Sequence, residues 1–439
     1  METELERIAG KARQDTNFKF TSLCHHITSG LVWGSLNKIP KKSAPGIDGV
    51  TVEMAKESFN EWIGELIQSI HRKGYKAPAV RRVWIPKPGK TQKRPIGVPN
   101  VADRALQRSA SLVLSTIYEQ DFLSCSFGGR PNQGAHNALA TLNEKILGKK
   151  VNWIQEADLK NFFGSLNHKW LLQFVKHRVG DPRILSLIQR WLKAGVMEDG
   201  KINSSDEGTP QGGSISVLLS NVYLHYVLDL WFEKVVRPRL RGEAHLIRYV
   251  DDFIVCFQYK SDALSFQRVL KKRLNKFSLE LETSKTQLIE FGRYAVERAK
   301  EKRRKVQTLY FLGFTHYCTI NRKGKFTVGR KTEKTRFARA YKKMKEHMLK
   351  NRHLSIKKQR GDINQRLRGH FAYYGIAGNM PSLNRLYRII DRYWRKVLIS
   401  RSQKAYITWE KYNRLKKIFP LQQPRIYLPY VEMKNKAVL

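Results

Sequence analysis

Two adjacent aspartates in an otherwise apolar stretch constrain this chain more than any other feature. β-branched and aromatic residues dominate positions 246–250 and 253–256, and Asp251 and Asp252 lie between them. This pattern predicts two short strands joined by a turn that carries both carboxylates. Adjacent like charges repel each other, and a divalent cation would relieve that repulsion. For these few residues alone, a solvated acidic turn is the alternative interpretation.

The charge balance indicates what the chain binds. Its 439 residues include 82 Lys and Arg against 37 Asp and Glu, a formal net charge of +45 with a sequence pI of about 10.2. Such an excess repels itself unless a polyanion offsets it, so we expect a nucleic-acid partner and binding that weakens as salt rises. An anionic membrane is the rival, but the sequence shows no basic amphipathic helix at a terminus and no lipidation signal.

Cysteine usage and hydropathy predict a cytoplasmic protein without a membrane partner. There is no Cys-x-x-Cys pair, which argues against a zinc ribbon and for a reducing compartment; the four cysteines are Cys24, Cys125, Cys256 and Cys318. No secretory signal opens the sequence. The longest apolar run, residues 214–232, is typical of a buried helix and not of a membrane span, because it is interrupted by Asn221, His225 and Asp229.

Periodicity and turn residues divide the chain into segments. Residues 1–75 are predicted to be helical apart from a loop at 44–49, and residues 80–99 to form a basic hairpin that could equally be an ordinary exposed one. The expected order continues with helices at 103–117 and 133–147, a strand at 151–157 followed by Asp158, helices to about 195, helices at 214–232 and 263–277, and strands near 286–291 and 309–314. From about residue 326 the pattern becomes almost wholly helical and strongly basic.

The predicted helix around residues 383–397 has two stripes. The apolar stripe consists of Leu383, Leu386, Ile390, Tyr393 and Val397. The basic stripe on the opposite side consists of Arg385, Arg388, Arg392 and Arg395. A charged stripe is commonly a solvated face, but acids are scarce among these bases, which favours binding to RNA in a groove.

Separated carboxylates could form one metal site. Phosphoryl transfer to a hydroxyl is served by two divalent ions about 4 Å apart, and such ions prefer carboxylate oxygens. Asp158 at a strand end, beside Asp251 and Asp252 on a hairpin, would supply those oxygens. Glu156 shares a strand face with Asp158 but lies roughly 6–7 Å farther back, so it ranks second, and a salt-bridged acid is its more ordinary interpretation.

Short motifs follow one another in a specific order along nearly the whole chain. Five of them resemble the palm of a reverse transcriptase: Asp158-Leu159-Lys160-Asn161-Phe162-Phe163, Thr209-Pro210-Gln211-Gly212-Gly213, Tyr249-Val250-Asp251-Asp252, Lys285, and Phe311-Leu312-Gly313-Phe314. Others resemble parts of the group II intron branch: the fingers at 85–88, 94–99, 103–104 and 126–131, the N-terminal extension at 17–22 and 45–49, and the thumb at 369–375. The chain is thus similar to group II intron-encoded reverse transcriptase/maturases of the bacterial type that lacks an endonuclease.

The resemblance implies an α+β fold of the right-hand polymerase class, with an antiparallel palm sheet plus helices and a basic α-helical thumb. The expected domains are an N-terminal extension with the start of the fingers at 1–75, fingers at 76–150, palm at 151–320, thumb or maturase domain at 326–418 and a short tail at 419–439. No endonuclease motif follows the thumb, so we expect that module to be absent.

The resemblance also implies the roles of single residues. Asp158, Asp251 and Asp252 would ligate two Mg²⁺ ions. Incoming nucleotide would be bound by Lys87 and Arg94 at its triphosphate, by Phe163 as a gate against a ribose 2′-hydroxyl, by Gln211 and Gly212 at the base pair, and by Lys285 at the departing pyrophosphate. Leu312 and Gly313 would support the primer end. A solvated lysine and ordinary strand packing are the alternatives for Lys285 and for the last pair.

Three positions depart from the family pattern. Glu156 stands where relatives usually have Asp, Gly164 where they often have Asp, and Gly129 where they often have Phe. None of the three is a predicted metal ligand, so we expect polymerase activity to be retained. Their effects should be confined to how neighbouring residues fit together.

These features together predict an RNA-directed DNA polymerase that also binds its intron RNA to assist splicing and supports retrohoming by target-primed reverse transcription. Its partners would be group II intron RNA, an RNA template with a DNA primer, target DNA and deoxynucleoside triphosphates. Without an endonuclease, the primer would come from a nascent strand at a replication fork or from reverse splicing into single-stranded DNA. The alternatives are a domesticated or retron-like reverse transcriptase in phage defence or repair, and a mainly RNA-binding splicing factor.

Overall fold

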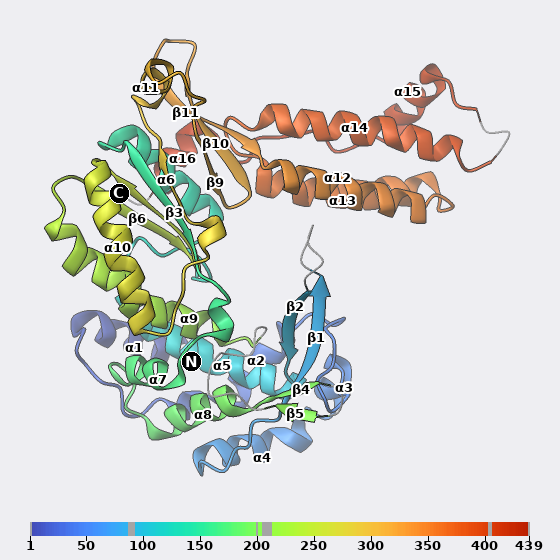
Figure 1. Ribbon diagram of the computed structural model, residues 1–439. Helices are drawn as coiled ribbons and strands as arrows, with labels where there is room; N and C mark the ends of the chain where they lie inside the picture. The colour runs from blue at the N-terminus through green and yellow to red at the C-terminus, as the bar shows by residue number, and fades with distance from the viewer. Residues whose placement is uncertain (1, 87–92, 199–200, 204–212, 403–405, 438–439) are drawn as a thin grey trace. The chain divides into compact units, whose positions relative to one another are not determined.

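The computed structural model describes residues 2–86, 93–198, 201–203, 213–402 and 406–437 (Figure 1). They belong to two compact units, the first made of residues 1–134, 157–255 and 259–287, the second of residues 135–156, 256–258 and 288–439. Helices and sheets are mixed, which confirms the α+β class. In the described part of the chain, no helix is long and apolar enough to cross a membrane.

The first unit is mainly helical. Its helices are α1 (Glu2–Gln14), α2 (Ser29–Asn37), α3 (Val52–Glu57), α4 (Phe59–His71), α5 (Val101–Asp121), α7 (His168–Lys176), α8 (Pro182–Lys193), α9 (Ser216–Leu224) and α10 (Lys260–Lys276). Wider helical turns at His225–Asp229 and Phe232–Val236 follow α9, so the apolar run predicted as one buried helix is helical almost throughout. Its strands are β1 (Val80–Pro86), β2 (Lys93–Val98), β4 (Val196–Glu198), β5 (Lys201–Asn203) and β6 (Ala244–Tyr249).

The second unit contains the C-terminal helices. Its elements are α6 (Ala135–Gly148), α11 (Ala295–Glu301), α12 (Lys334–Lys350), α13 (Ile356–Tyr374), α14 (Met380–Ile399), α15 (Trp409–Ile418) and α16 (Tyr430–Lys436), with strands β9 (Thr308–Phe311), β10 (Phe314–Ile320) and β11 (Phe326–Thr332). Three further strands have residues in both units: β3 (Trp153–Asp158), β7 (Asp252–Phe257) and β8 (Gln287–Glu290).

The predicted basic hairpin is part of a larger sheet. β1 and β2 pair antiparallel, as expected, with Val83 opposite Ile96. The sheet order is β2-β1-β4-β5, and β4 and β5 were not predicted because strands of three residues show no periodicity. The Trp84 indole donates to a carboxylate oxygen of Glu198 at 2.6 Å, which fastens β4 to the hairpin.

The expectation of helix from about residue 326 is wrong for its first seven residues. They form β11, which pairs antiparallel with β10 so that Ile320 lies opposite Phe326. The alternation typical of a half-buried strand is obscured in the sequence, because the inward positions include a charged residue, Arg330, and an outward position is Gly329. Helix α12 begins only at Lys334.

Helices α12, α13 and α14 run side by side in the second unit (Figure 1). The predicted apolar stripe of α14 is buried at Leu383, Leu386, Ile390 and Val397, and Trp394 completes it. Met344 of α12 and Leu367 and Phe371 of α13 pack against the stripe. The indole of Trp394 donates to the Gln359 side chain at 3.1 Å, so the buried polar group of the stripe has a partner.

One buried carboxylate anchors the N-terminal segment. Asp181 precedes α8, which has Pro182 in its first turn, a favoured arrangement for a helix start. The Asp181 carboxylate is 0% exposed and accepts the backbone N–H groups of Leu23 at 2.7 Å and Cys24 at 2.8 Å. Burial raises the pKa of Asp181, but hydrogen bonds from Arg183, Leu23 and Cys24 outweigh it and lower the pKa to about 2.

We predict that Asp181→Asn lowers the free energy of unfolding by about 2 kcal/mol at pH 7, because a pKa depressed by nearly two units contributes that much. A depressed carboxylate pKa stabilises the fold above the unfolded pKa, and the contribution is lost as the pH falls through the folded pKa of about 2. The difference between wild type and variant should therefore shrink between about pH 4 and pH 2. Denaturant unfolding at a series of pH values measures it.

The matched control is Asp15→Asn, whose carboxylate accepts the backbone N–H of Asn17 in an exposed hydrogen bond. We expect a change below about 0.5 kcal/mol for this variant. A loss in Asp181→Asn that is independent of pH would contradict the role of the charge.

Candidate catalytic site

Two neighbouring strands bring Asp158 and Asp252 together. The sheet has the order β6-β7-β3-β8, so β7 and β3 are hydrogen-bonded neighbours. The backbone N–H of Asn152, next to the start of β3, donates to the carbonyl of Phe257 at the end of β7, at 2.9 Å. The two strands therefore run antiparallel. Asp158, the last residue of β3, then lies beside Asp252, the first residue of β7.

The predicted hairpin is present, with a strained turn. β6 ends at Tyr249 and β7 begins at Asp252, so that Val250 and Asp251 form the connection. Val250 has φ of +59°, a left-handed conformation that β-branched residues rarely adopt. Such a conformation persists only where surrounding contacts hold it.

A buried arginine holds this turn. The side chain of Arg248 is 0% exposed, and its guanidinium forms two hydrogen bonds with the buried carboxylate of Asp229, at 2.8 and 2.6 Å. It also donates to the Asn221 side chain at 2.9 Å and to the carbonyl of Val250 at 3.0 Å. Burial lowers the pKa of Arg248, but Asp229 outweighs burial and raises it, so the guanidinium stays charged.

The loop at 126–131 packs beneath the same turn. The Ser126 hydroxyl accepts from Arg248 at 2.8 Å, and the Phe127 N–H donates to the Arg248 carbonyl at 2.9 Å. A Cβ atom on Gly128 would lie 2.6 Å from the backbone N of Val250, so only glycine allows this approach. Gly129 has φ of +70°, and a Cβ there would lie 2.2 Å from Val217, which explains why phenylalanine is absent at this position.

A lysine reaches the site through a second pairing. Leu159 pairs with Leu281, and the Glu282 N–H donates to the Asp158 carbonyl at 2.8 Å. This places Lys285 so that its ammonium group forms an ion pair with the Asp158 carboxylate. Burial lowers the pKa of Lys285, but the hydrogen bond with Asp158 and the charges of Asp158 and Asp252 outweigh it and raise the pKa above its ordinary value. Lys285 therefore lies in the field of both acids.

The donors suit Mg²⁺, although they are not grouped around an ion position. Carboxylate oxygens are the ligands that Mg²⁺ prefers, and the ammonium of Lys285 shows that a cation is favoured beside Asp158. Among the residues that the structure describes, no three His, Cys, Asp or Glu side chains are arranged to hold a metal ion. A divalent ion would have to displace Lys285 from Asp158, and joint ligation by Asp158, Asp251 and Asp252 stays a prediction.

Phe163 lies close to this site in sequence and is shaped by its neighbours. It belongs to the turn Phe162–Gly164, where Phe162 is buried and Phe163 is half-buried, with ring centroids 5.4 Å apart. Asn161, which precedes the turn, has φ of +46°. A Cβ on Gly164 would lie 2.5 Å from the Asn161 side chain, so the glycine in place of the family's aspartate fits this local conformation.

The structure does not describe some of the predicted nucleotide-binding residues, or describes only their backbone. Lys87, Gln211 and Gly212 lie outside the described residues, and Arg94 is placed only by its backbone in β2, opposite Ile85. Their roles stay predictions.

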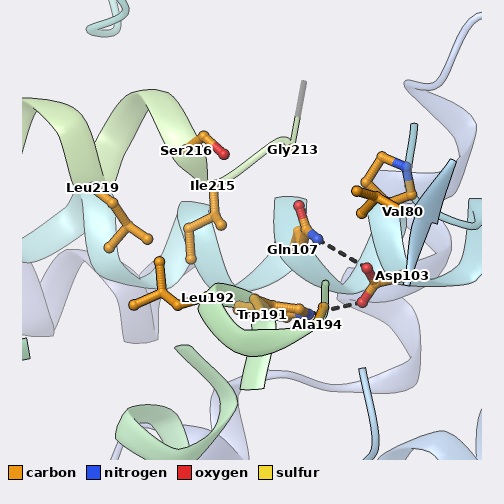
Figure 2. A pocket seen from close by; sticks show the side chains of 11 residues that line it. Val80, Asp103, Gln107, Trp191, Leu192, Ala194, Gly213, Ile215, Ser216 and Leu219 are labelled. Atoms are coloured by element: carbon orange, nitrogen blue, oxygen red, sulfur yellow. Dashed lines mark hydrogen bonds between the residues drawn. The ribbon is translucent and has the colours of Figure 1, made fainter. Parts of the chain in front are cut away.

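Gly213, next to that segment, rests on a buried network (Figure 2). The Asp103 carboxylate accepts hydrogen bonds from Tyr75, from the Trp191 indole at 2.8 Å and from the Gln107 amide at 2.9 Å. Burial raises the pKa of Asp103, and these hydrogen bonds oppose the rise. A Cβ on Gly213 would lie 2.8 Å from the Gln107 amide oxygen, so a larger residue there would have to shift the Gln107 side chain.

The predicted primer-support residues form a tight turn in the second unit. Leu312 and Gly313 have φ of +47° and +80° and connect β9 to β10. The Tyr373 hydroxyl donates to the Leu312 carbonyl at 2.9 Å, and the Glu333 N–H donates to the Gly313 carbonyl at 3.0 Å. Helix α13 and the start of α12 therefore fix this turn.

The basic stripe of α14 is mostly on the surface. Arg385, Arg388 and Arg392 are exposed. Arg395 is half-buried, because its guanidinium lies 4.3 Å from the ring centre of Trp409 and donates to the Ile407 carbonyl at 2.6 Å. Three of the four arginines are thus accessible to a ligand, while Arg395 also holds the start of α15.

The Arg248–Asp229 pair was missed in the sequence. Asn221 and Asp229 interrupt the apolar run 214–232. By themselves these polar residues disfavour a membrane span but do not indicate Arg248 as their partner. Both turned out to be partners of Arg248. An arginine inside an apolar strand and an aspartate inside an apolar helix are together the signal that could have found the pair.

Comparison with known proteins indicates the family of this chain. The sequence model of the family described as "Reverse transcriptase (RNA-dependent DNA polymerase)" matches residues 85–316. The chain is 27% identical over 302 residues to Group II intron-encoded protein LtrA of Lactococcus lactis subsp. cremoris, covering 66% of this chain and 50% of that protein. It is 34% identical over 202 residues to Protein YkfC of Escherichia coli (strain K12), covering 45% of this chain and 53% of that protein.

A similarity to a plant protein is shorter. The chain is 26% identical over 198 residues to Nuclear intron maturase 3, mitochondrial, of Arabidopsis thaliana, covering 40% of this chain and 27% of that protein. The chain spans about half the length of the two bacterial relatives.

We predict that Arg248→Met lowers the free energy of unfolding by about 3–5 kcal/mol, because it leaves the buried Asp229 carboxylate without its partner. The double variant Arg248→Met/Asp229→Leu should recover part of the loss, since no uncompensated charge stays buried. The control is Arg237→Met, which breaks the exposed ion pair with Glu233 and should cost less than about 1 kcal/mol. Equal losses for Arg248→Met and Arg237→Met in denaturant unfolding would contradict this account.

Proposed function

The chain belongs to the reverse transcriptase family, whose sequence model matches residues 85–316 of its 439, and we propose on this premise that it is the RNA-directed DNA polymerase of a group II intron. One observation carries the proposal: Asp158 and the Asp251–Asp252 turn lie at adjacent strand ends inside the matched region, with Lys285 ion-paired to Asp158. The similarity to an intron-encoded protein supports a group II intron as the genetic element that encodes this enzyme.

The proposed architecture is a right-hand polymerase. The sheet β6-β7-β3-β8 would be the palm sheet, the hairpin of β1 and β2 would belong to the fingers at 76–150, and helices α12, α13 and α14 would form the thumb. The palm would extend over 151–320. Because β11 occupies Phe326–Thr332, the helical part of the thumb would begin at Lys334 and not at 326.

Asp158, Asp251 and Asp252 would hold two Mg²⁺ ions. When bound, the ions would supply the charge that activates the primer hydroxyl and stabilises the leaving pyrophosphate. The carboxylate chemistry supports this role, as does the pairing of β3 with β7, the strands that end and begin at Asp158 and Asp252. The buried Arg248 would position the turn that carries Asp251 and Asp252, without contact with the substrate.

Lys285 would act on the leaving group. Its pKa is raised by Asp158 and Asp252 against the effect of burial, so the ammonium stays protonated at neutral pH. The ammonium would donate a hydrogen bond or a proton to the departing pyrophosphate. The exposed stem of Lys285, with 59% of the side chain accessible, allows the ammonium to move.

The nucleotide would be recognised by residues around this centre. Lys87 and Arg94 would bind the triphosphate as cationic donors, and Gln211 and Gly212 would lie against the base pair. Phe163 would leave no room for a ribose 2′-hydroxyl. Leu312 and Gly313 would support the primer end, which the fixed turn between β9 and β10 favours.

A second activity, binding of the intron RNA to assist its splicing, would use the thumb. The exposed arginines Arg385, Arg388 and Arg392 and the similarity to an intron maturase support it. Retrohoming by target-primed reverse transcription would follow from both activities. A domesticated or retron-like enzyme in phage defence or repair is the alternative, and an intron RNA structure flanking the coding sequence would argue against it.

We predict that Asp251→Ala/Asp252→Ala abolishes DNA synthesis on an RNA template, with a loss above about 100-fold, because even outer-sphere groups at metal sites are worth 10–100-fold. RNA binding should stay within about twofold. Primer extension and filter binding on one preparation measure both. Glu280→Gln, which changes an exposed acid paired with Lys160, is the control and should retain synthesis. Loss of RNA binding at unchanged stability would contradict the division of roles.

We predict that Phe163→Ala lowers the preference for deoxynucleotides over ribonucleotides by about 10–100-fold, since removing a steric wall is worth about 1–3 kcal/mol of discrimination. Phe163→Tyr keeps the bulk of the ring and should keep the preference. The ratio of kcat/KM for the two nucleotide classes is the measurement. An unchanged ratio in Phe163→Ala would remove Phe163 from the role of gate.

A further inference from the structure

The sheet of β9, β10 and β11 has one buried and one open face. On β9 burial alternates: Leu309 and Phe311 are 0% and 2% exposed, whereas Tyr310 between them is 47% exposed. On the same side as Tyr310, Tyr317 and Thr319 of β10 are half-buried, Thr315 is buried, and Lys331 of β11 is exposed. Arg330 of β11, on the buried face, donates to the Asn143 side chain of α6. The open face therefore points away from the core of the second unit, whose sheet and helices are shown in Figure 1.

Register places two tyrosines next to each other on the open face. Tyr310 lies opposite Thr315, and Tyr317 lies opposite Thr308, so the two tyrosines are diagonal neighbours on adjacent strands. Diagonal neighbours are separated by roughly 7–8 Å, about twice the 3.4 Å spacing of stacked bases. Each ring can thus accept its own base.

The ring of Tyr317 lies flat on the sheet. Its cross-strand neighbour is Gly329, and a Cβ at Gly329 would lie 2.3 Å from a ring carbon of Tyr317. Glycine at this position therefore leaves room for the ring to rest against the backbone of β11. The ammonium of Lys331 lies 5.9 Å from the ring centre, which places a cation beside the aromatic surface.

The charge in the sequence around this face is mainly basic. Between Glu301 and Glu333 the sequence contains no Asp or Glu and nine basic residues, Lys302, Arg303, Arg304, Lys305, Arg322, Lys323, Lys325, Arg330 and Lys331. Two of the nine do not serve the open face, because Arg304 pairs with Glu290 and Arg330 lies on the buried face. Three of the basic residues lie in the turn joining β10 and β11, whose backbone is held by the Asn321 side chain, which accepts the N–H groups of Lys323 at 2.9 Å and Lys325 at 3.0 Å. Those three side chains, Arg322, Lys323 and Lys325, are exposed.

We propose that this face, defined by Tyr310, Tyr317 and Lys331 together with the basic turn at 321–325, binds an unpaired segment of RNA. Aromatic rings on an open sheet stack unpaired bases, and neighbouring cations contact the phosphates. Thr308, Thr319 and Thr327 on the same face carry hydroxyl groups that can bond a ribose 2′-hydroxyl, which distinguishes RNA from DNA.

The proposed site extends away from the predicted primer support. Tyr310 lies two residues before the Leu312–Gly313 turn at the start of β10, whereas the basic turn follows the end of this seven-residue strand, roughly 20 Å farther on. The proposal does not depend on polymerase activity, and its failure would leave the proposed function unaffected.

Binding of a labelled, unstructured 12-nucleotide (CA)6 RNA to the full chain tests the proposal. An excess of unlabelled 20-base-pair RNA–DNA duplex occupies duplex-binding surfaces during the measurement. Tyr310→Ala/Tyr317→Ala should weaken binding at least about tenfold, since base–aromatic stacking is worth roughly 1–3 kcal/mol per base. Tyr310→Phe/Tyr317→Phe keeps both rings and should bind as the wild type does. The DNA oligonucleotide of the same sequence should bind several-fold more weakly than the RNA.

Three results would overturn the proposal. One is a change below twofold in the alanine variant with its melting temperature retained. Another is equal weakening in the phenylalanine and alanine variants, which would indicate a structural effect of the hydroxyl groups. Equal affinity for RNA and DNA would exclude RNA as the specific ligand. A further variant changes only the basic turn and leaves the sheet unchanged. In Arg322→Gln/Lys323→Gln/Lys325→Gln, the slope of log K against log salt concentration should become shallower by about 2, since each lost phosphate contact contributes about 0.7.

Discussion

The candidate site depends on one buried ion pair. A guanidinium removed from water is very costly unless its charge is paired and its N–H groups are bonded. Arg248 satisfies both conditions through Asp229, Asn221 and Ser126. The same side chain bonds the carbonyl of Val250, which has a left-handed conformation. The contacts that compensate the buried charge therefore also fix the turn that presents the two adjacent aspartates.

Local patterns in the sequence were sufficient for the strand before Asp158, for the hairpin around Asp251 and for the apolar stripe of α14. Long-range pairing was not visible. Arg248 and Asp229 are 19 residues apart and belong to different elements, and Lys285 reaches Asp158 across 127 residues through a strand pairing. Strand β11 was missed because Arg330 occupies an inward position. In each case the deciding contact was tertiary, so neither periodicity nor propensity could reveal it.

Charge is distributed unevenly over the molecule, and the distribution agrees with the proposed division of roles. Asp158 and Asp252 lie near each other at the site and raise the pKa of Lys285, although its ammonium is partly removed from water. Much of the surface elsewhere is basic: the overall charge is +45. On α14 the exposed basic residues lie on the surface of helices that share a packed core. Beside Tyr317 the basic residues lie next to an open sheet that carries aromatic rings. Positive charge attracts any nucleic acid. The strand pairing at the candidate site would determine the reaction, and aromatic stacking on the open sheet would determine which nucleic acid binds there.

The proposed chemistry requires that Asp158 and Asp252 meet at one cation site. Mn²⁺, a paramagnetic substitute for Mg²⁺, makes this measurable by electron paramagnetic resonance of the free ion during titration. We expect wild type to bind Mn²⁺ that Mg²⁺ displaces, and both Asp158→Asn and Asp252→Asn to weaken the same binding at least about tenfold. If neither substitution changes the Mn²⁺ affinity, or if only one of them does, the two carboxylates do not share a site and the account is wrong.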